Sequence, residues 1–290
     1  MKLFPRAVRM CELMGLAFEK PIRADFSLRE FSGRGDDNPD GWGLGWYPDR
    51  SLAHVKEPVR WGASRFSRFL EGYPNLLSPI FIAHVRHKTT GGEPTHADTQ
   101  PFVRELGGLE YCFAHNGTVL GIDVPPTARF RPVGDTDSER LFCHLMAQIE
   151  RRGSELNGEA DWSWLHQTLV ELNRHGTMNL LFSEGRRLYC YHDAARHKGL
   201  SYRNLVVRHH RRRCFEDSEV RIKLGTRSVN HGFVIASQPL SADGWQSFEP
   251  GELLVVEAGT LRFSSHRASA GLAAETPVNG SPALQSIPTP

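Results

Sequence analysis

Cys11 is the residue whose position most directly suggests chemistry, because it follows an internal methionine, Met10, and opens the apolar run CELMGL. A thiol is a useful nucleophile when a base removes its proton. If the chain began at Cys11, its own α-amine could be that base, since an α-amine titrates at about 8 and a thiol at about 8.5. An amide nitrogen between Met10 and Cys11 has no such basicity. Cys11 is therefore either the first residue of a working enzyme or a buried cysteine in a strand.

Other polar groups stand at the ends of apolar segments or in shaped loops. They are DGWG (40–43), His84-Val85-Arg86 with Thr89, His115-Asn116-Gly117, and DTDSE (135–139). Taken singly, each has an ordinary structural explanation. Asn-Gly is typical of a hairpin turn, Asp137 of a helix cap, Arg86 of a salt bridge, and DGWG of a loop with a packed tryptophan.

Together these residues fit acyl transfer from an amide, which needs a nucleophile, a base, oxyanion donors and groups that hold the substrate. The side-chain amide of Asn116 and the N–H of Gly117 could form an oxyanion hole, each donor contributing about 3 kcal/mol. Arg86 could pair with a carboxylate and Asp137 with an ammonium. These are the two ends of an α-amino acid. The residues therefore predict a substrate with a free α-amino-acid head and a side-chain amide, namely glutamine or a γ-glutamyl compound.

The composition is that of an ordinary globular protein. Its 290 residues are 39% hydrophobic and 23% charged, and the net charge of +2 gives no global attraction to nucleic acid or to a membrane. The five cysteines form no CxxC pair, which indicates a reducing compartment. No apolar run approaches the roughly 20 residues of a membrane span, and the first nine residues lack a secretory h-region. We therefore expect a cytoplasmic protein.

Apolar runs predict the elements that position these residues. Strands are expected over 11–18, 80–86, 109–115, 179–182, 187–191, 205–207 and 232–237, with a hairpin over 252–263. Helices are expected over 26–31, 64–70, 136–151 and 162–175, with a turn at Asn116-Gly117 and a shaped loop over 34–45. Strands around central helices predict an α+β layered sandwich over 11–265. Residues 266–290 contain almost no large apolar side chains and are expected to be a disordered tail.

The same residues resemble a known family. Met10-Cys11-Glu12-Leu13, DGWG, HVRHKTT (84–90), QPF (100–102), AHNG (114–117) and DTDSE look like the ordered motifs of class II glutamine amidotransferases, most closely the stand-alone YafJ-like subgroup. The match spans about 10–263 and includes ASQPL (236–240) and FEPGEL (248–253). The resemblance implies an N-terminal-nucleophile hydrolase fold, in which two antiparallel sheets are stacked between helical layers as a four-layer αββα sandwich.

The resemblance also implies a mechanism. The Cys11 thiolate, its proton taken by its own α-amine, would attack the side-chain amide while Asn116 and Gly117 hold the oxyanion. Ammonia would leave, and water would hydrolyse the thioester. No cofactor and no metal is implied.

Further positions of the family motifs would bind the substrate. Arg86 would bind the α-carboxylate and Asp137 the α-amine, while Thr89 would line the same pocket. Trp42 and Gly43 would belong to a loop near the substrate.

Two features depart from the family pattern. Nine residues precede Met10, so residues 1–10 are a mis-assigned start, a propeptide removed by self-cleavage, or a retained leader that disables the enzyme. The first explanation is favoured, because Met10-Cys11 is a good initiation pair. The segment after Phe263 is also too short and polar to form a domain that receives ammonia, so either a separate enzyme accepts the ammonia or water is the acceptor.

Other functions fit the sequence less well. The basic run RHHRRR (208–213) could bind nucleic acid, although arginine runs in loops are more often a solvated face. Fourteen histidines include no HExxH and no metal-ligand spacing. A binding module that holds glutamine or a γ-glutamyl compound without turnover, or a specialised γ-glutamyl peptide or thiol hydrolase, remains an alternative.

Overall fold

The fold is built on two antiparallel sheets. A computed structural model of the chain describes residues 11–28, 40–86, 93–208, 213–216 and 220–266. The larger sheet has the strand order β13-β9-β12-β1-β4-β2-β3, with β11 paired to β1 and β10 paired to β11. Its strands are β1 (Glu12–Leu28), β2 (Trp42–Trp46), β3 (Ala53–Glu57), β4 (Leu77–Val85), β9 (Ser201–Val207), β10 (Arg213–Glu216), β11 (Val220–Gly225), β12 (Asn230–Ala236) and β13 (Gln246–Ser247). The smaller sheet, in the order β15-β14-β8-β7-β6-β5, comprises β5 (Phe102–Leu106), β6 (Leu109–Val119), β7 (Gly176–Ser183), β8 (Arg187–Tyr191), β14 (Leu253–Glu257) and β15 (Thr260–Ser264).

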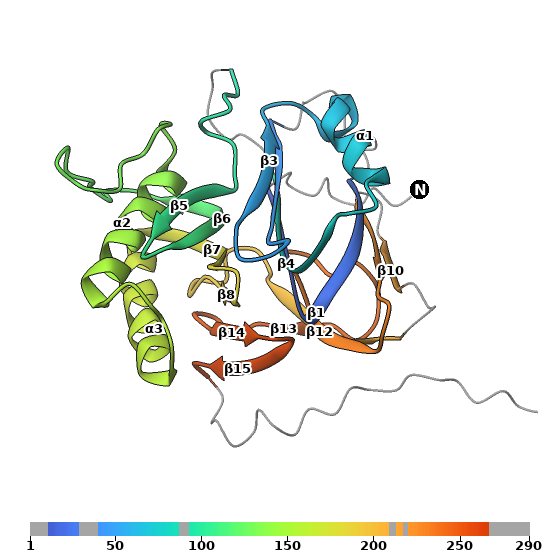
Figure 1. The fold of residues 1–290 in the computed structure, drawn as a ribbon. Helices are drawn as coiled ribbons and strands as arrows, with labels where there is room; N and C mark the ends of the chain where they lie inside the picture. The colour runs from blue at the N-terminus through green and yellow to red at the C-terminus, as the bar shows by residue number, and fades with distance from the viewer. Residues whose placement is uncertain (1–10, 29–39, 87–92, 209–212, 217–219, 267–290) are drawn as a thin grey trace, which may run out of the picture.

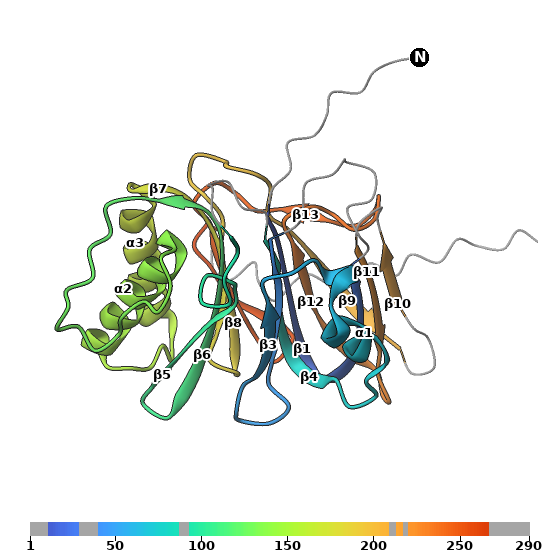
Figure 2. The same ribbon diagram turned by 90° about the horizontal axis from the view of Figure 1, so that it is seen from above.

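Helices lie on the outer faces of the two stacked sheets (Figures 1 and 2). The helices α2 (Asp137–Arg152) and α3 (Glu159–Asn173) cover the smaller sheet, and α1 (Arg65–Gly72) lies with the 3₁₀ helix η1 (Trp61–Ala63) against the larger one. This arrangement is the α+β, four-layer αββα sandwich that the resemblance implies. The layer beside the larger sheet is thin, because a single short helix forms most of it.

The alternation of side chains along β1 explains how the layers hold together. Leu13 and Ala17 are buried between the two sheets, whereas Met14, Leu16 and Phe18 are buried on the outer face of the larger sheet. Successive residues of a strand point to opposite faces, so an apolar residue at nearly every position is what a strand covered on both sides requires. The strand at Cys11 therefore belongs to the centre of the fold.

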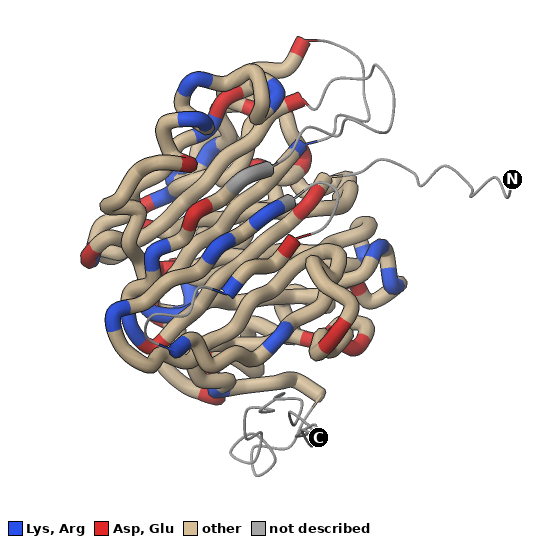
Figure 3. Tube along the Cα trace, turned by 90° about the vertical axis from the view of Figure 1, so that its right-hand side faces the viewer, with Lys and Arg blue, Asp and Glu red and all other residues tan. Residues whose placement is uncertain are grey.

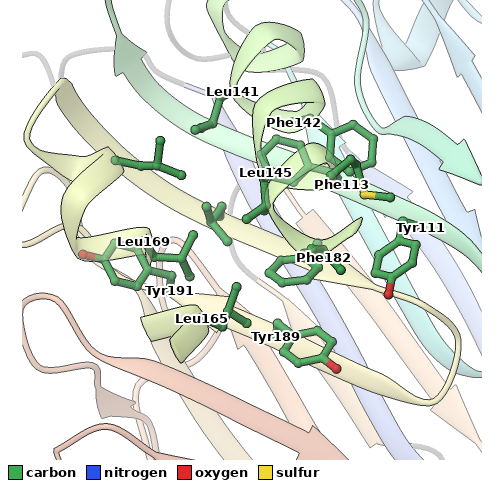
Figure 4. Packing of buried hydrophobic residues seen from close by; sticks show 14 of the residues in the cluster. Tyr111, Phe113, Leu141, Phe142, Leu145, Leu165, Leu169, Phe182, Tyr189 and Tyr191 are labelled. Atoms are coloured by element: carbon green, nitrogen blue, oxygen red, sulfur yellow. The ribbon is translucent and has the colours of Figure 1, made fainter. Parts of the chain in front are cut away.

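Aromatic stacking joins the smaller sheet to its helices (Figure 4). Phe113 of β6 stacks on Phe142 of α2 with ring centroids 4.7 Å apart. Leu145, Leu165 and Leu169 from the two helices are buried in the same cluster. Fully burying an apolar side chain of this size stabilises the fold by roughly 1.5–3 kcal/mol, so this cluster fixes α2, and with it Asp137, over β6.

Most predicted elements are present, but some local predictions are wrong. The helix expected over 26–31 is wrong as far as the structure describes it, because β1 continues to Leu28. Pro21 does not end β1, since the pairing with β4 shifts register between Ala17 and Ile22, and such an irregularity tolerates proline. The turn expected at Asn116-Gly117 is also wrong, since β6 runs on to Val119 in register with β7.

Several predictions fall on residues outside the described ranges. They are the leader 1–10, nearly all of the tail, Thr89, and most of the basic run 208–213.

On the face shown in Figure 3, acidic and basic residues are interspersed. None of the helices in the described ranges has the length and hydropathy needed to cross a bilayer. Within the same ranges no three His, Cys, Asp or Glu side chains are grouped to hold a metal ion.

Glu184 is a buried carboxyl group in the turn between β7 and β8. Its Oε1 lies 3.1 Å from Arg187, while its Oε2 has no hydrogen-bond partner among the described residues. Arg187 also pairs with Glu257 at 2.9 Å, so the guanidinium keeps a charged partner when Glu184 is neutral. Burial raises the pKa of Glu184 from 4.5 to about 7. The folded state therefore favours the protonated carboxyl group.

This pKa shift predicts a pH-dependent stability. The stabilisation from neutral Glu184 is fully present below about pH 4.5, where the unfolded chain is also protonated, and is lost as the pH rises through about 7. Relative to Glu184→Gln, the wild type should lose on the order of 2–3 kcal/mol of unfolding free energy between pH 4.5 and 8. Urea unfolding at both pH values measures this difference, with the exposed Glu105→Gln as the control. Parallel pH profiles for wild type and Glu184→Gln would contradict it.

Candidate active site

The candidate site lies where β1 begins beside the end of β4. In the antiparallel register Glu12 pairs with Val85 and Leu13 with His84, so Cys11 comes opposite Arg86. Leu13 is buried between the sheets, and residues of the same parity in one strand share a face. Cys11 therefore faces the inter-sheet space with Arg86, and its side chain is half-buried.

The smaller sheet supplies an amide to this end of the sandwich. Cys112 and Ala114 of β6 are buried between the sheets, so Asn116, two residues further along, points the same way. Its Nδ2 donates to the carbonyl oxygen of Cys11 at 2.6 Å, and a second acceptor, Ser237 Oγ, lies 3.4 Å away. The structure thus brings Cys11 and Asn116 together from strands far apart in the sequence.

His84 orients this amide. The Nε2 atom of His84 lies 3.2 Å from Asn116 Oδ1. An amide oxygen can only accept a hydrogen bond, so Nε2 of His84 carries the proton. Because Oδ1 of Asn116 faces His84, its Nδ2 faces Cys11. Burial lowers the pKa of His84 to about 3, and the nearby Arg86 also lowers it, so the imidazole is neutral. Its Nδ1 is buried without a hydrogen-bond partner in the described residues.

The side chain of His115 points to the other face of β6, toward α2. His115 Nδ1 lies 2.9 Å from Ser138 Oγ, so this histidine faces away from Asn116 as the alternation predicts. Gly117 has φ +149°, and a Cβ there would lie 2.0 Å from the carbonyl oxygen of Thr177. Glycine is required at this position because a side chain would push β6 away from β7.

Among the described residues, the guanidinium group of Arg86 is only partly paired. Its backbone is fixed to the neighbouring segment by hydrogen bonds to Gly41 O (2.8 Å) and from Asp40 N–H (3.0 Å). Its Nη1 is buried and has no hydrogen-bond partner in the described part of the chain. Leaving a buried cationic donor unpaired is costly, and a carboxylate is the group that pairs with a guanidinium best. Arg86 is thus arranged to receive an anion opposite Cys11.

Asp137 lies at the start of α2, after β6. The preceding residue, Thr136, caps the helix by accepting from Glu139 N–H. Asp137 Oδ2 accepts from Val119 N–H at 2.8 Å, and its Oδ1 accepts from Ser138 N–H at 2.9 Å. These bonds hold the carboxylate at the end of the strand that carries Asn116. Each oxygen retains a lone pair for a further donor.

Trp42 and Gly43 do not occupy the loop that the sequence predicts, because both lie in β2. Trp42 is fully buried on the outer face of the larger sheet, with its ring 4.4 Å from that of Trp61. Its side chain therefore points away from the inter-sheet site. A Cβ at Gly43 would lie 2.2 Å from the carbonyl oxygen of Gln100, so the backbone of Gln100 occupies the space that a side chain at Gly43 would need. Both residues pair with β4, and their assignment to the neighbourhood of the substrate stays a prediction.

Ser237 is a site residue that sequence reasoning missed. Its Oγ accepts from Leu13 N–H at 2.6 Å, and its own N–H donates to Leu13 O at 3.0 Å. These bonds fix the end of β12 to the start of β1 beside Asn116. The segment ASQPL contributes to the family resemblance, but a single serine within it carries no signal of this contact.

Comparisons with known proteins identify the family of the chain. The family model for class II glutamine amidotransferases matches residues 10–278. An uncharacterised protein of Methanocaldococcus jannaschii, MJ1515, is 38% identical over 260 residues, covering 89% of this chain and 72% of that protein. Escherichia coli (strain K12) YafJ, named as a candidate glutamine amidotransferase, is 31% identical over 256 residues, covering 84% of this chain and 96% of YafJ.

A solved structure shares the fold along nearly its whole length. The crystal structure of a Pseudomonas aeruginosa protein described as a predicted glutamine amidotransferase superposes with a TM-score of 0.66 at 25% identity, covering 87% of this chain and 99% of that one. The αββα sandwich is accordingly of the N-terminal-nucleophile hydrolase type. The chain belongs to the class II glutamine amidotransferase family, in its YafJ-like subgroup.

Proposed function

We propose that this protein hydrolyses the side-chain amide of glutamine or of a γ-glutamyl compound, with Cys11 as the nucleophile. The observation that carries the proposal is the convergence of three groups on one end of the sandwich. Asn116 Nδ2 lies 2.6 Å from the Cys11 carbonyl oxygen, and the underpaired guanidinium of Arg86 lies opposite Cys11 in the sheet. A nucleophile, an oxyanion donor and an anion receptor are the parts that amide hydrolysis of an amino-acid side chain requires.

The mature enzyme in this proposal begins at Cys11. Its α-amine then takes the thiol proton, which the Met10–Cys11 amide could not do. Removal of residues 1–10, by initiation at Met10 followed by loss of that methionine or by self-cleavage, creates this amine. The half-buried position of Cys11 at the start of β1 supports the assignment, because the nucleophile stays open to a substrate while β1 holds its backbone.

The proposed hydrolysis proceeds in two steps, formation of a thioester and its hydrolysis. The thiolate attacks the amide carbon, and Asn116 Nδ2 with Gly117 N–H stabilises the negative oxygen that forms. The amide nitrogen takes a proton from the α-ammonium and leaves as ammonia or an amine, which produces a γ-glutamyl thioester. Water then attacks the thioester, and the thiol and glutamate are released. Water is a sufficient acceptor, and a separate enzyme that receives the ammonia is the other possibility.

The amino-acid head of the substrate is held away from the thiol. Arg86 pairs with the α-carboxylate through two parallel hydrogen bonds, and Asp137 accepts from the α-ammonium. Thr89 is assigned to the same pocket by the family motif alone. The described cysteines are free thiols, which supports a reducing, cytoplasmic location for the enzyme.

Replacing the nucleophile tests the mechanism. Cys11→Ala should abolish release of ammonia from glutamine and of amine from γ-glutamyl compounds, because no other group can form the thioester. Its thermal unfolding should match that of the wild type, since Cys11 is only half-buried. Cys214→Ala, which removes an exposed thiol, should retain activity. Normal turnover by Cys11→Ala would disprove the mechanism, and a wild type that binds glutamine without turnover would favour the binding module.

The proposed role of Arg86 in binding the substrate α-carboxylate leads to a second prediction. Arg86→Lys keeps the positive charge but loses the planar guanidinium group that can form two parallel hydrogen bonds to a carboxylate. KM should therefore rise roughly 10- to 100-fold while kcat changes less. Steady-state hydrolysis with glutamine and with a γ-glutamyl dipeptide measures both constants. Arg65→Lys, on the exposed surface of α1, is the matched control. A KM equal to that of the wild type would remove Arg86 from the binding site.

A further inference from the structure

Lys198 lies in the segment that joins β8 to β9, and the backbone of this segment is held in place. The Asp193 carboxylate accepts from the N–H groups of Ala195 (2.9 Å) and His197 (2.8 Å). The carbonyl oxygen of His197 accepts from Asn179 at 2.7 Å, and that of Lys198 lies 3.0 Å from His192 Nε2. The backbone at Lys198 is therefore fixed relative to β7 and to the end of β8.

The backbone of Lys198 adopts an uncommon conformation that these bonds maintain. Its φ is +54°, in the left-handed region that non-glycine residues seldom occupy. Such a conformation costs free energy and persists where surrounding contacts enforce it. Lys198 is thus directed by the loop rather than left to solvent.

The side chain of Lys198 reaches the catalytic end of the sandwich. It is half-buried, and its charge interacts with Cys11 and Glu12 on β1 and with His84 and His115. Burial lowers the pKa of Lys198, and negative charge at Cys11 and Glu12 opposes that effect. No hydrogen bond or ion pair to its ammonium group is formed within the described ranges. A partly desolvated ammonium without a partner favours an anionic ligand.

Lys198 and Arg86 lie on opposite sides of Cys11. In the larger sheet β4, which precedes Arg86, is next to β1 on one side, and β12 followed by β9 lies on the other. Ser201 at the start of β9 pairs with Ala236 of β12, which pairs with Met14 of β1, so the segment before β9 ends near Cys11. Strands are about 4.8 Å apart, which places the start of β9 roughly 10 Å from β1. A lysine side chain spans most of that distance.

The positions of Arg86 and Lys198 on either side of Cys11 indicate where the leaving group of the substrate would lie. A γ-glutamyl group with its α-carboxylate at Arg86 and its amide carbon at Cys11 has the amide nitrogen directed away from β4. The leaving amine therefore lies on the side of β12 and β9, where Lys198 is. Free ammonia from glutamine offers no anion there, whereas the amine of an amino acid or peptide carries a carboxylate.

We propose that Lys198 binds a carboxylate on the leaving-group side, so that γ-glutamyl amino acids and peptides are preferred to substrates with a neutral leaving group. The proposal rests on the proposed function and specifies its substrate class. Lys198 is then a specificity-determining residue that acts at the end of the substrate opposite Arg86. Water hydrolyses the amide bond, and the products are glutamate and a free amino acid or peptide. No further reactant is needed.

The test compares two substrates that differ mainly in one charge, γ-glutamylglycine and γ-glutamylglycinamide. Wild type should hydrolyse γ-glutamylglycine with the higher kcat/KM. In Lys198→Met the ratio of the two kcat/KM values should fall roughly 10- to 100-fold, because the charge-assisted contact is lost. Lys198→Arg should keep most of the ratio, and Lys20→Met, a change at an exposed lysine in β1, should leave it unaltered.

The outcomes separate this assignment from the proposed function. If wild type hydrolyses both compounds with equal kcat/KM, the proposed function stands and the role of Lys198 is disproved, even if no Lys198 variant folds. A loss of activity in Lys198→Met that is equal for both substrates also disproves it, because that result indicates a general effect on the thiol or the fold. If wild type hydrolyses neither compound nor glutamine, the proposed function fails, and the assignment fails with it.

Discussion

The hydrogen bond from Asn116 Nδ2 to the Cys11 carbonyl oxygen, 2.6 Å long, joins the two sheets at the site. The two sheets approach closely where glycines of the larger sheet face side chains of the smaller one. A Cβ at Gly15 would lie 2.9 Å from Leu188, and one at Gly45 would lie 2.5 Å from the Cys112 sulfur. Larger side chains at these positions would separate the layers and move the amide away from Cys11. The geometry of the candidate site thus depends on packing deep in the sandwich.

A buried neutral group sits among the charges of the site. His84 is fully buried between Arg86 and Asn116, and its lowered pKa of about 3 keeps it uncharged across the physiological range. It can therefore donate to Asn116 Oδ1 without adding a cation beside Arg86. The positive charge that remains at β4 is that of Arg86, where a substrate carboxylate belongs in the proposed reaction. A protonated His84 would compete for the same anion.

The sequence allowed a good prediction of the layers and of the strands that carry the candidate site residues, since these depend on local patterns. The strand expected over 11–18 is the first part of β1, and the helix expected over 136–151 is α2. The strands that begin or end near Cys11, Arg86 and Asn116 were also expected.

The errors occurred where a distant part of the chain decides the outcome. Asn116-Gly117 has the composition of a turn, but pairing with β7 keeps it in a strand, where Gly117 meets Thr177. Trp42 lies in β2 rather than a loop because β4 pairs with it. Neither Ser237 nor Lys198 carries a sequence pattern. Ser237 is placed by its hydrogen bond with Leu13 of β1, and Lys198 by the bonds that Asn179 and His192 make to its loop.

The most direct test of the central claim is the intact mass of the protein expressed from its native gene, before and after reaction with a glutamine analogue that carries a diazoketone in place of the side-chain amide. We expect a chain that begins at Cys11 and gains a single adduct on that residue. Glutamine or a γ-glutamyl peptide should slow the labelling, and the Arg86→Lys variant should label more slowly. An adduct on another cysteine, or a chain that begins at Cys11 and remains unlabelled, would contradict Cys11 as the nucleophile.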